Sequence, residues 1–187
     1  MDQQPDTTAE SEAIEVSVVI PCLNEAETLA VCIRKAHEGL TEAEAVGEVV
    51  VADNGSSDDS IEIAKENGAR VVQVARPGYG SALMGGIESA RGRFVIMGDA
   101  DDSYDFREAP KFIAKLREGN DLVQGCRLPA GGGTVAPGAM PWSHRWIGNP
   151  MLTWLVRRWF KAQIHDVYCG LRGFSKELYA RLDQRCT

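Results

Sequence analysis

Four aspartates crowd a short stretch of the chain directly behind an apolar run. The stretch reads RFVIMGDADDSYDF and carries Asp99, Asp101, Asp102 and Asp105. Carboxylates placed this close together repel one another. The run before them, residues 93–97, has the pattern of a buried strand and ends at Gly98. Carboxylates grouped at the tip of a core strand indicate that a positive charge binds there.

Polar residues follow two earlier apolar runs in the same way. The run VSVVI at 16–20 precedes PCLNEAETL, and the run EVVVAD at 48–53 ends in DNGSSDDS. Each cluster alone fits a turn or a helix cap, because Asn, Asp and Ser are common there. Three clusters are harder to explain as turns, since ligands in parallel sheets bind at the carboxyl ends of strands. The sequence therefore predicts one site built from all three clusters.

Strand and helix signals alternate along the chain. Apolar residues recur at helical spacing between the runs, and short runs predict strands at 16–20, 48–53, 70–75, 93–97 and 121–125. This order predicts an α/β fold with a mainly parallel sheet and helices on both faces. The Gly- and Pro-rich segment at 129–141 breaks the pattern and is interpreted equally well as a linker or a lid.

Composition narrows the class of protein. The 187 residues suit one domain, predicted at 15–187 behind a polar, acidic tail at 1–14 that we expect to be disordered. A net charge of −7 argues against duplex nucleic acid as a partner. Five cysteines without a CxxC pair favour a reducing, cytoplasmic compartment. The sequence contains no apolar stretch of about 18 residues that would span a bilayer.

These motifs resemble the catalytic domain of family 2 glycosyltransferases, which have the GT-A (Rossmann-like) fold. The branch in question includes dolichyl-phosphate mannosyltransferase and related polyprenyl-phosphate sugar transferases. The resemblance covers residues 16–180 and rests on VVIPCLNEAETL, VVVADNGSSDDS, RPGYGSALMGGIESARGRFVIMGDADDSYDF, MPWSHRWIGN and HDVYCGLRGFSKE. It implies inverting transfer from a GDP- or UDP-sugar to a polyprenyl or dolichyl phosphate, with Mg²⁺ or Mn²⁺ as cofactor. Relatives continue beyond the point where this chain stops, so the resemblance also implies a C-terminally truncated domain.

The resemblance implies roles for individual residues. The metal motif matches Asp99 and Asp101, with Ser103 as a further contact, and Asp101 is also expected to act in catalysis. Asp102 lies outside the minimal motif and is expected to tune the site or, slightly favoured, to cap the next helix. Many relatives have aspartate where this chain has Asn54, which leaves base selectivity open. The implied nucleotide-sugar-binding residues are Pro21, Leu23, Asn24, Glu25, Asp53, Asn54, Ser56, Gly80, Asp99, Ala100 and Asp101.

The acceptor side is inferred from the C-terminal third. An ionised phosphate acceptor needs cations rather than a general base, and arginine suits phosphate. The segments that match the family's acceptor side contain Arg127, Arg145 and Arg172, of which the first two are the better catalytic candidates. Residues 151–162 predict a basic amphipathic helix, either a core helix with a basic outer face or a membrane-interface helix. A lipid acceptor favours the second, with the enzyme peripheral at the cytoplasmic face of a membrane.

Two alternatives remain at this stage. A nucleotidyltransferase would also place aspartate-held Mg²⁺ on an α/β sheet, although PCLNEAETL lacks the Gly and Lys usual in its first loop. A non-catalytic fragment that only binds a nucleotide sugar is the other. Release of pyrophosphate from a nucleoside triphosphate would favour the nucleotidyltransferase. Nucleotide binding without sugar transfer would favour the non-catalytic fragment.

Overall fold

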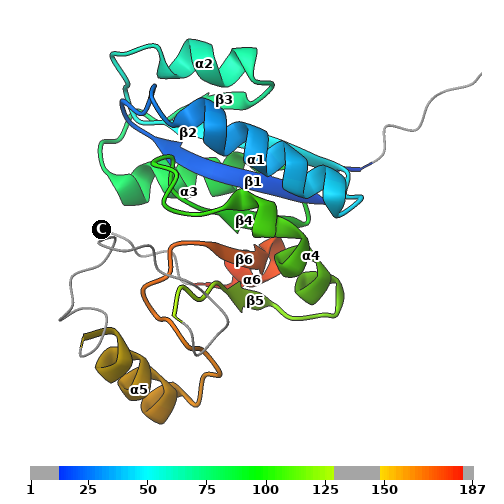
Figure 1. Ribbon diagram of the computed structural model, residues 1–187, viewed down its shortest axis with the longest axis vertical. Coiled ribbons are helices and arrows are strands. Elements are labelled where there is room, and N and C mark those ends of the chain that lie inside the picture. Colours follow the sequence, from blue (N-terminus) through cyan, green and yellow to red (C-terminus); the bar gives the residue numbers. More distant parts are fainter. Residues whose placement is uncertain (1–12, 129–147, 183–187) are drawn as a thin grey trace, which may run out of the picture.

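The computed structural model describes residues 13–128 and 148–182 (Figure 1). Residues 1–12 of the tail predicted at 1–14, the 129–141 segment and Arg145 lie outside the described residues. The strands are β1 (Val16–Cys22), β2 (Gly47–Asp53), β3 (Arg70–Gln73), β4 (Phe94–Met97), β5 (Leu122–Gln124) and β6 (Arg172–Ser175). The helices are α1 (Leu29–Glu42), α2 (Ser60–Glu66), α3 (Tyr79–Ser89), the short 3₁₀ helix η1 (Phe106–Glu108), α4 (Ala109–Arg117), α5 (Asn149–Phe160) and α6 (Lys176–Arg181).

One mixed sheet with the strand order β3-β2-β1-β4-β6-β5 forms the centre of the molecule. The first four strands are parallel, with Val19 of β1 opposite Val50 of β2 and Met97 of β4. This confirms the predicted α/β fold with a mainly parallel sheet. The sequence did not reveal β6, which pairs antiparallel with both β4 and β5. Its four residues, RGFS, carry a glycine and no alternating pattern, so periodicity could not identify it.

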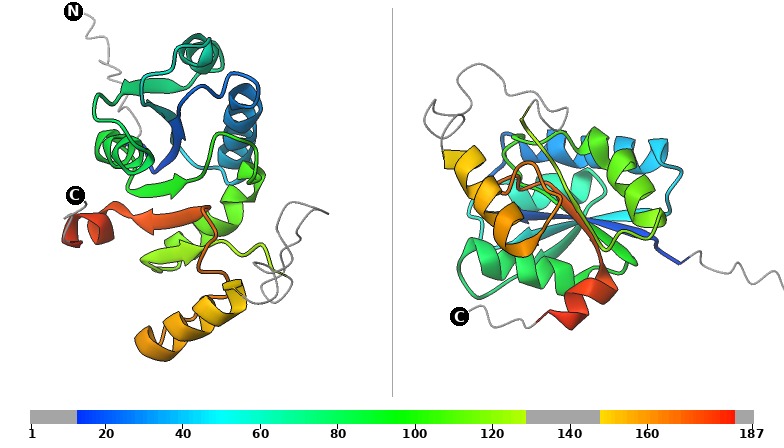
Figure 2. Two further views of the ribbon diagram at one scale, coloured as in Figure 1. Left: turned by 90° about the vertical axis from the view of Figure 1, so that its left-hand side faces the viewer. Right: turned by 90° about the horizontal axis from the view of Figure 1, so that it is seen from below.

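Helices cover both faces of the sheet, as predicted, and Figure 2 shows α1 and α3 on opposite sides of it. Alternate residues of one strand face opposite ways, so Val18 of β1 packs toward α1 and Val19 toward α3. The larger apolar cluster contains side chains of α1, α2, η1 and α4. The smaller one joins the sheet to α3 and α6. The strand ends are thus held rigidly from both sides.

The aspartate-rich loop after β4 is fixed by a close helix contact. The loop ends in η1, whose Phe106 side chain is fully buried in the larger apolar cluster. A Cβ atom added to Gly39 of α1 would lie 2.5 Å from the carbonyl oxygen of Phe106. Only glycine allows α1 and η1 to approach this closely, so α1 sets where the loop can lie.

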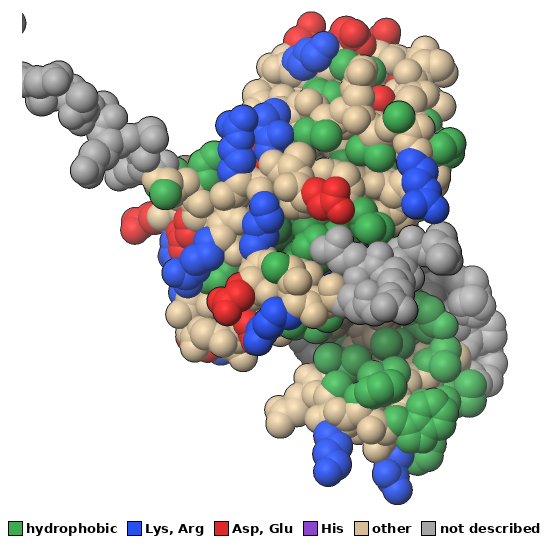
Figure 3. Space-filling model, turned by 180° about the vertical axis from the view of Figure 1, so that it is seen from behind, with side chains coloured by type: hydrophobic (Ala, Val, Ile, Leu, Met, Phe, Trp, Pro, Cys, Tyr) green, Lys and Arg blue, Asp and Glu red, His purple; other side chains and the backbone are tan. Residues whose placement is uncertain are grey.

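Helix α5 does not behave as a core helix. Its buried residues are Asn149 and Thr153, while Trp159 is 69% exposed and Phe160 is 73% exposed. Figure 3 shows hydrophobic side chains gathered on the lobe that contains α5. The interpretation of this segment as a core helix with a basic outer face is therefore wrong, because the polar Thr153 packs inward and the aromatic residues face outward. In the described parts of the chain, no helix is both long and apolar enough to cross a bilayer.

Candidate functional site

A cavity of about 540 Å³ lies at the carboxyl ends of the parallel strands. Its walls come from the loops after β1, β2 and β4 and from the first turn of α3, so the three polar clusters of the sequence do meet. The lining residues are Pro21, Cys22, Leu23, Glu25, Asn54, Pro77, Gly78, Tyr79, Ala82, Asp99, Ala100 and Asp101.

Hydrogen bonds connect the loop after β1 to the loop after β2. Asn24, whose φ of 58° is left-handed, accepts from the backbone N–H of Ser57 at 2.8 Å. Its own backbone N–H donates to Oγ of Ser56 at 2.9 Å, and that of Glu25 donates to Oγ of Ser60 at 3.0 Å. Asn24 and Ser56, both predicted to bind the nucleotide, are therefore placed to shape the cavity wall rather than to line it.

Asp53 is the last residue of β2 and organises the turn that follows the strand. The residue is 2% exposed, and its carboxylate accepts from the backbone N–H groups of Gly55 at 3.1 Å and Ser56 at 3.2 Å. Gly55 has a φ of 94°, a conformation that side chains disfavour. The structure thus gives Asp53 a turn-forming role, and its predicted contact with the nucleoside stays a prediction.

Asn54 joins this turn to the segment between β3 and α3. Its Nδ2 donates to the carbonyl oxygens of Val74 at 2.9 Å and Arg76 at 2.8 Å. Its Oδ1 accepts from the backbone N–H of Gly78 at 2.7 Å. An aspartate has no hydrogen to donate, so it could make the third bond and neither of the first two. Asn54 thus fixes the segment between β3 and α3 against the turn after β2.

Asp99 and Asp101 reach the cavity from the end of β4. Oδ1 of Asp99 accepts from Oη of Tyr79 at 2.7 Å, and Oδ1 of Asp101 accepts from the backbone N–H of Ser103 at 3.0 Å. The Ser103 side chain lines a separate groove along α4, and Gly80 is also outside the cavity lining, whereas its neighbours Gly78 and Tyr79 line it. Sequence reasoning missed Tyr79, for which its place in PGYGS was the only signal.

The donor set suits Mg²⁺ or Mn²⁺. In the described parts of the chain, no group of three or more His, Cys, Asp or Glu side chains could hold a metal ion alone. Two carboxylates that open into one cavity nevertheless match the way Mg²⁺ usually binds, through one or two carboxylates, waters and substrate phosphates. Asp99 and Asp101 would hold the ion, and the other ligands would come from the substrate and water.

The two other aspartates of the loop serve its structure. Asp102 forms an ion pair with Lys35 of α1 at 2.8 Å and has a left-handed φ of 59°. The slightly favoured prediction that it caps the next helix is wrong, because this backbone turn directs its side chain to α1. Asp105 is the cap instead and accepts from the backbone N–H of Arg107 at the start of η1.

The nearby cysteines and the tyrosine are held in their neutral forms. Burial raises the pKa of the Cys32 thiol to about 11, and burial also raises the pKa of Cys22. Partial burial of the phenol, together with its hydrogen bond to Asp99, raises the pKa of Tyr79. A neutral thiol is a poor nucleophile, so the cavity wall offers no activated cysteine. The Tyr79 phenol therefore stays neutral, and its O–H donates a hydrogen bond to Asp99.

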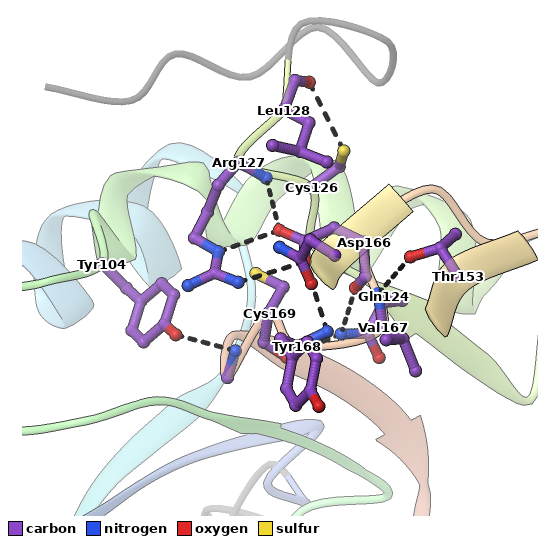
Figure 4. A network of polar contacts seen from close by, with 12 residues as sticks. Tyr104, Gln124, Cys126, Arg127, Leu128, Thr153, Asp166, Val167, Tyr168 and Cys169 are labelled. Carbon is purple, nitrogen blue, oxygen red and sulfur yellow. Dashed lines mark hydrogen bonds and ion pairs between the residues drawn. The ribbon is translucent and has the colours of Figure 1, made fainter. Parts of the chain in front are cut away.

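A buried ion pair connects the end of β5 to α5 (Figure 4). Asp166 is fully buried and accepts from Nε of Arg127 at 2.8 Å, Nη2 of Arg127 at 3.1 Å and Nδ2 of Asn149 at 3.1 Å. Burial alone would raise the pKa of Asp166, but the hydrogen bonds from Arg127 outweigh it and hold the pKa below its usual value. The guanidinium charge of Arg127 is therefore largely balanced by a carboxylate, which sequence reasoning did not anticipate.

Of the other two predicted acceptor-side arginines, the described residues include Arg172 and do not include Arg145. Arg172 begins β6 and donates to the carbonyl oxygens of Cys169 at 3.0 Å and Val167 at 3.4 Å. It thereby fixes the loop that carries Asp166. Arg145 belongs to the undescribed part of the chain, so its predicted role stays a prediction.

The chain belongs to glycosyl transferase family 2, whose family model matches residues 17–183. It is 41% identical over 169 residues to the low-salt glycan biosynthesis hexosyltransferase Agl6 of Haloferax volcanii, covering 90% of this chain and 40% of that protein. It is 34% identical over 129 residues to the dolichyl-phosphate hexose transferase of the same organism, and this match covers 69% of this chain and 54% of that protein. This chain therefore spans about half the length of these relatives. The match confirms the family resemblance and disfavours the nucleotidyltransferase alternative.

A solved structure supports the GT-A-like fold. It is glucosyl-3-phosphoglycerate synthase from Mycobacterium tuberculosis in complex with Mn²⁺, UDP and glucosyl-3-phosphoglycerate. The two chains are 26% identical with a TM-score of 0.67, and the match covers 88% of this chain and 58% of the other. The predicted fold class is confirmed.

Replacing Asn54 with aspartate should loosen the segment at 74–78. The variant loses two hydrogen bonds and sets a carboxylate against two carbonyl oxygens, a cost of about 1–3 kcal/mol for the local structure. We expect amide hydrogen exchange across residues 74–79 to become at least about fivefold faster, since each 1.4 kcal/mol is a factor of ten. Asn67→Asp is the matched control, because that amide bonds only Ile63 at the end of α2. Unchanged amide exchange in Asn54→Asp would show that Asn54 does not stabilise the segment at 74–78.

Proposed function

We propose that this chain carries the donor site of an inverting, metal-dependent glycosyltransferase. The reaction moves a sugar from a UDP- or GDP-sugar to a polyprenyl phosphate. One observation carries the proposal: Asp99 and Asp101 open into the same cavity as the loops after β1 and β2. If these carboxylates did not face that cavity, a cation bound to them could not reach a nucleotide held by the loops after β1 and β2.

The cavity suits a nucleotide diphosphate in size and chemistry. Its volume of about 540 Å³ lies in the range of small-molecule sites. Pro21 and Leu23 give an apolar wall for a base, and Glu25 and Asn54 add polar groups beside it. Gly78, with a φ of 116°, lets backbone approach the ligand without a side chain in the way.

The carboxylates at the end of β4 have a defined task in this scheme. Asp99 and Asp101 would hold Mg²⁺ or Mn²⁺ through oxygen atoms, the ligands that such ions prefer. When bound, the ion neutralises the negative charge that develops on the departing diphosphate. The backbone N–H of Ser103 fixes one oxygen of Asp101, and Tyr79 fixes one oxygen of Asp99. The complex of the solved relative with Mn²⁺ and UDP supports this assignment.

A phosphate acceptor agrees with the chemistry of the described residues. An ionised phosphate attacks without a general base, so the reaction needs cations that hold it in place. Arg127 and Arg145 are the proposed contacts, and the ion pair with Asp166 would keep the Arg127 guanidinium in one orientation. The name of the dolichyl-phosphate hexose transferase supports a lipid phosphate as acceptor.

We propose further that α5 contacts the membrane that contains the acceptor. Trp154, Trp159 and Phe160 are exposed on this helix, and Arg157 and Arg158 are exposed beside them. Aromatic and basic residues together suit the boundary between lipid headgroups and acyl chains. The network of Asn149, Asp166 and Arg127 ties this helix to the β5 end of the sheet. The enzyme would thus be peripheral at the cytoplasmic face of a membrane.

Replacing Asp101 with asparagine should abolish transfer while the fold persists. The change keeps an oxygen for the Ser103 N–H and removes the charge that holds the cation, which contributes several kcal/mol to stabilising the leaving group. We expect transfer from UDP-glucose or GDP-mannose to dolichyl phosphate, with Mn²⁺ present, to fall at least about 100-fold. Radiolabelled sugar extracted into organic solvent measures it.

Asp102→Asn is the control for this experiment. It removes the neighbouring charge, which pairs with Lys35 and does not line the cavity. Comparable loss in both variants, or normal turnover by Asp101→Asn, would contradict the proposed mechanism. Mn²⁺-dependent UDP binding by the unaltered chain without any transfer would support the non-catalytic alternative.

Replacing both Trp159 and Phe160 with glutamine should weaken membrane binding. Two aromatic side chains that leave the interface lose at least about 1.5 kcal/mol of apolar burial, so partitioning onto vesicles of phosphatidylcholine and phosphatidylglycerol should fall by at least about tenfold. Co-sedimentation measures the bound fraction. Val46→Gln, which removes an exposed apolar side chain near the amino end of β2, is the control. Equal binding by the double variant and the unaltered chain would refute a membrane role for α5.

A further inference from the structure

We propose that Tyr79 is the positioning residue for Asp99. Its phenol holds the metal-binding carboxylate in the orientation that the cation needs. This inference rests on the proposed function, since it concerns the same cavity. It assigns a task to a side chain that neither the metal motif nor the strand-end motifs include.

The two side chains line the same cavity and come from different elements. Tyr79 begins α3 and Asp99 follows β4, yet Oη of Tyr79 lies 2.7 Å from Oδ1 of Asp99. The Tyr79 residue is 56% exposed, so packing does little to hold the ring. Its direction is set by the start of the helix and by the hydrogen bond itself.

The start of α3 is in turn fixed by Asn54. This amide donates to the carbonyl oxygens of Val74 and Arg76 and accepts from the backbone N–H of Gly78, the residue before Tyr79. Gly78 has a φ of 116°, which turns the chain sharply before the helix. A continuous path of bonds therefore runs from the end of β2 through Tyr79 to the carboxylate at the end of β4.

This geometry leaves the carboxylate free to bind a cation. An ionised carboxylate has two oxygens and about four acceptor positions, of which the phenol occupies one. Among the described residues, no side chain or backbone group donates a hydrogen bond to the second oxygen, Oδ2. Hydrogen bonds to a ligating side chain fix its orientation and commonly change metal affinity by about 10- to 100-fold. A phenol on Oδ1 is thus expected to strengthen metal binding through Oδ2.

The competing interpretation makes the opposite prediction. If the phenol merely occupied the place of the cation, its removal would free Asp99 and tighten metal binding. The sign of the change in Mn²⁺ affinity therefore decides between the two.

Tyr79→Phe is the decisive variant, because it deletes one oxygen atom and keeps the exposed ring. We expect its affinity for Mn²⁺ with UDP present, measured by electron paramagnetic resonance of the free ion, to be about tenfold weaker than that of the unaltered chain. Tyr104→Phe is the matched control. It deletes the other phenol near this loop, whose oxygen accepts from the backbone N–H of Gly170 instead of bonding Asp99. Its Mn²⁺ affinity should stay within about twofold of the unaltered value.

The outcomes separate the inference from the proposed function. Equal or tighter Mn²⁺ binding by Tyr79→Phe, or equal weakening in Tyr104→Phe, would overturn the role of Tyr79 and leave the metal site intact. An unaltered chain that bound no Mn²⁺, with or without UDP, would contradict the metal site itself and the inference with it. Weaker binding confined to Tyr79→Phe would support both.

Discussion

Parallel pairing of β1 with β2 on one side and with β4 on the other brings three loops to one edge of the sheet. The register places Cys22 opposite Asp53, so the first two strands end at the same level. Gly98, which follows β4, donates its backbone N–H to the carbonyl oxygen of Val19 at 3.3 Å. Everything in the site depends on this arrangement, because the residues that follow β1, β2 and β4 share one cavity only when these strands run the same way.

Much of the fold and of the cavity was predictable, for a physical reason. Buried parallel strands are nearly continuous apolar runs, and VSVVI and EVVVAD show that pattern plainly. The residues after such runs gather at the strand ends, which is why the clusters that contain Leu23, Asn54 and Asp99 were expected to meet, as they do in one cavity. β6 was not, because its short segment lacks any periodicity and its partners, β4 and β5, are distant in the chain.

Three features of the site were hidden for a different reason: they depend on contacts that no spacing encodes. The sequence predicts Asp53 and Asn24 as ligand contacts and does not show the hydrogen bonds that they make within the loops. Tyr79 looks like part of a glycine-rich turn, yet its hydroxyl reaches Asp99. Arg127 looks like a free cation, yet Asp166 balances its charge from a position 39 residues further on. Local pattern identifies polar residues at strand ends, and only the tertiary arrangement divides them between wall and ligand.

The central claim is that Asp99 and Asp101 hold a cation in the cavity shared by the loops after β1 and β2. Crystals soaked with Mn²⁺ and UDP test this directly, since anomalous scattering near the manganese edge locates the ion without assumptions about its ligands. The account predicts one strong peak between the two carboxylates, with the diphosphate of UDP beside it. A peak elsewhere on the chain, or UDP bound in the cavity while both carboxylates are unoccupied, would contradict it.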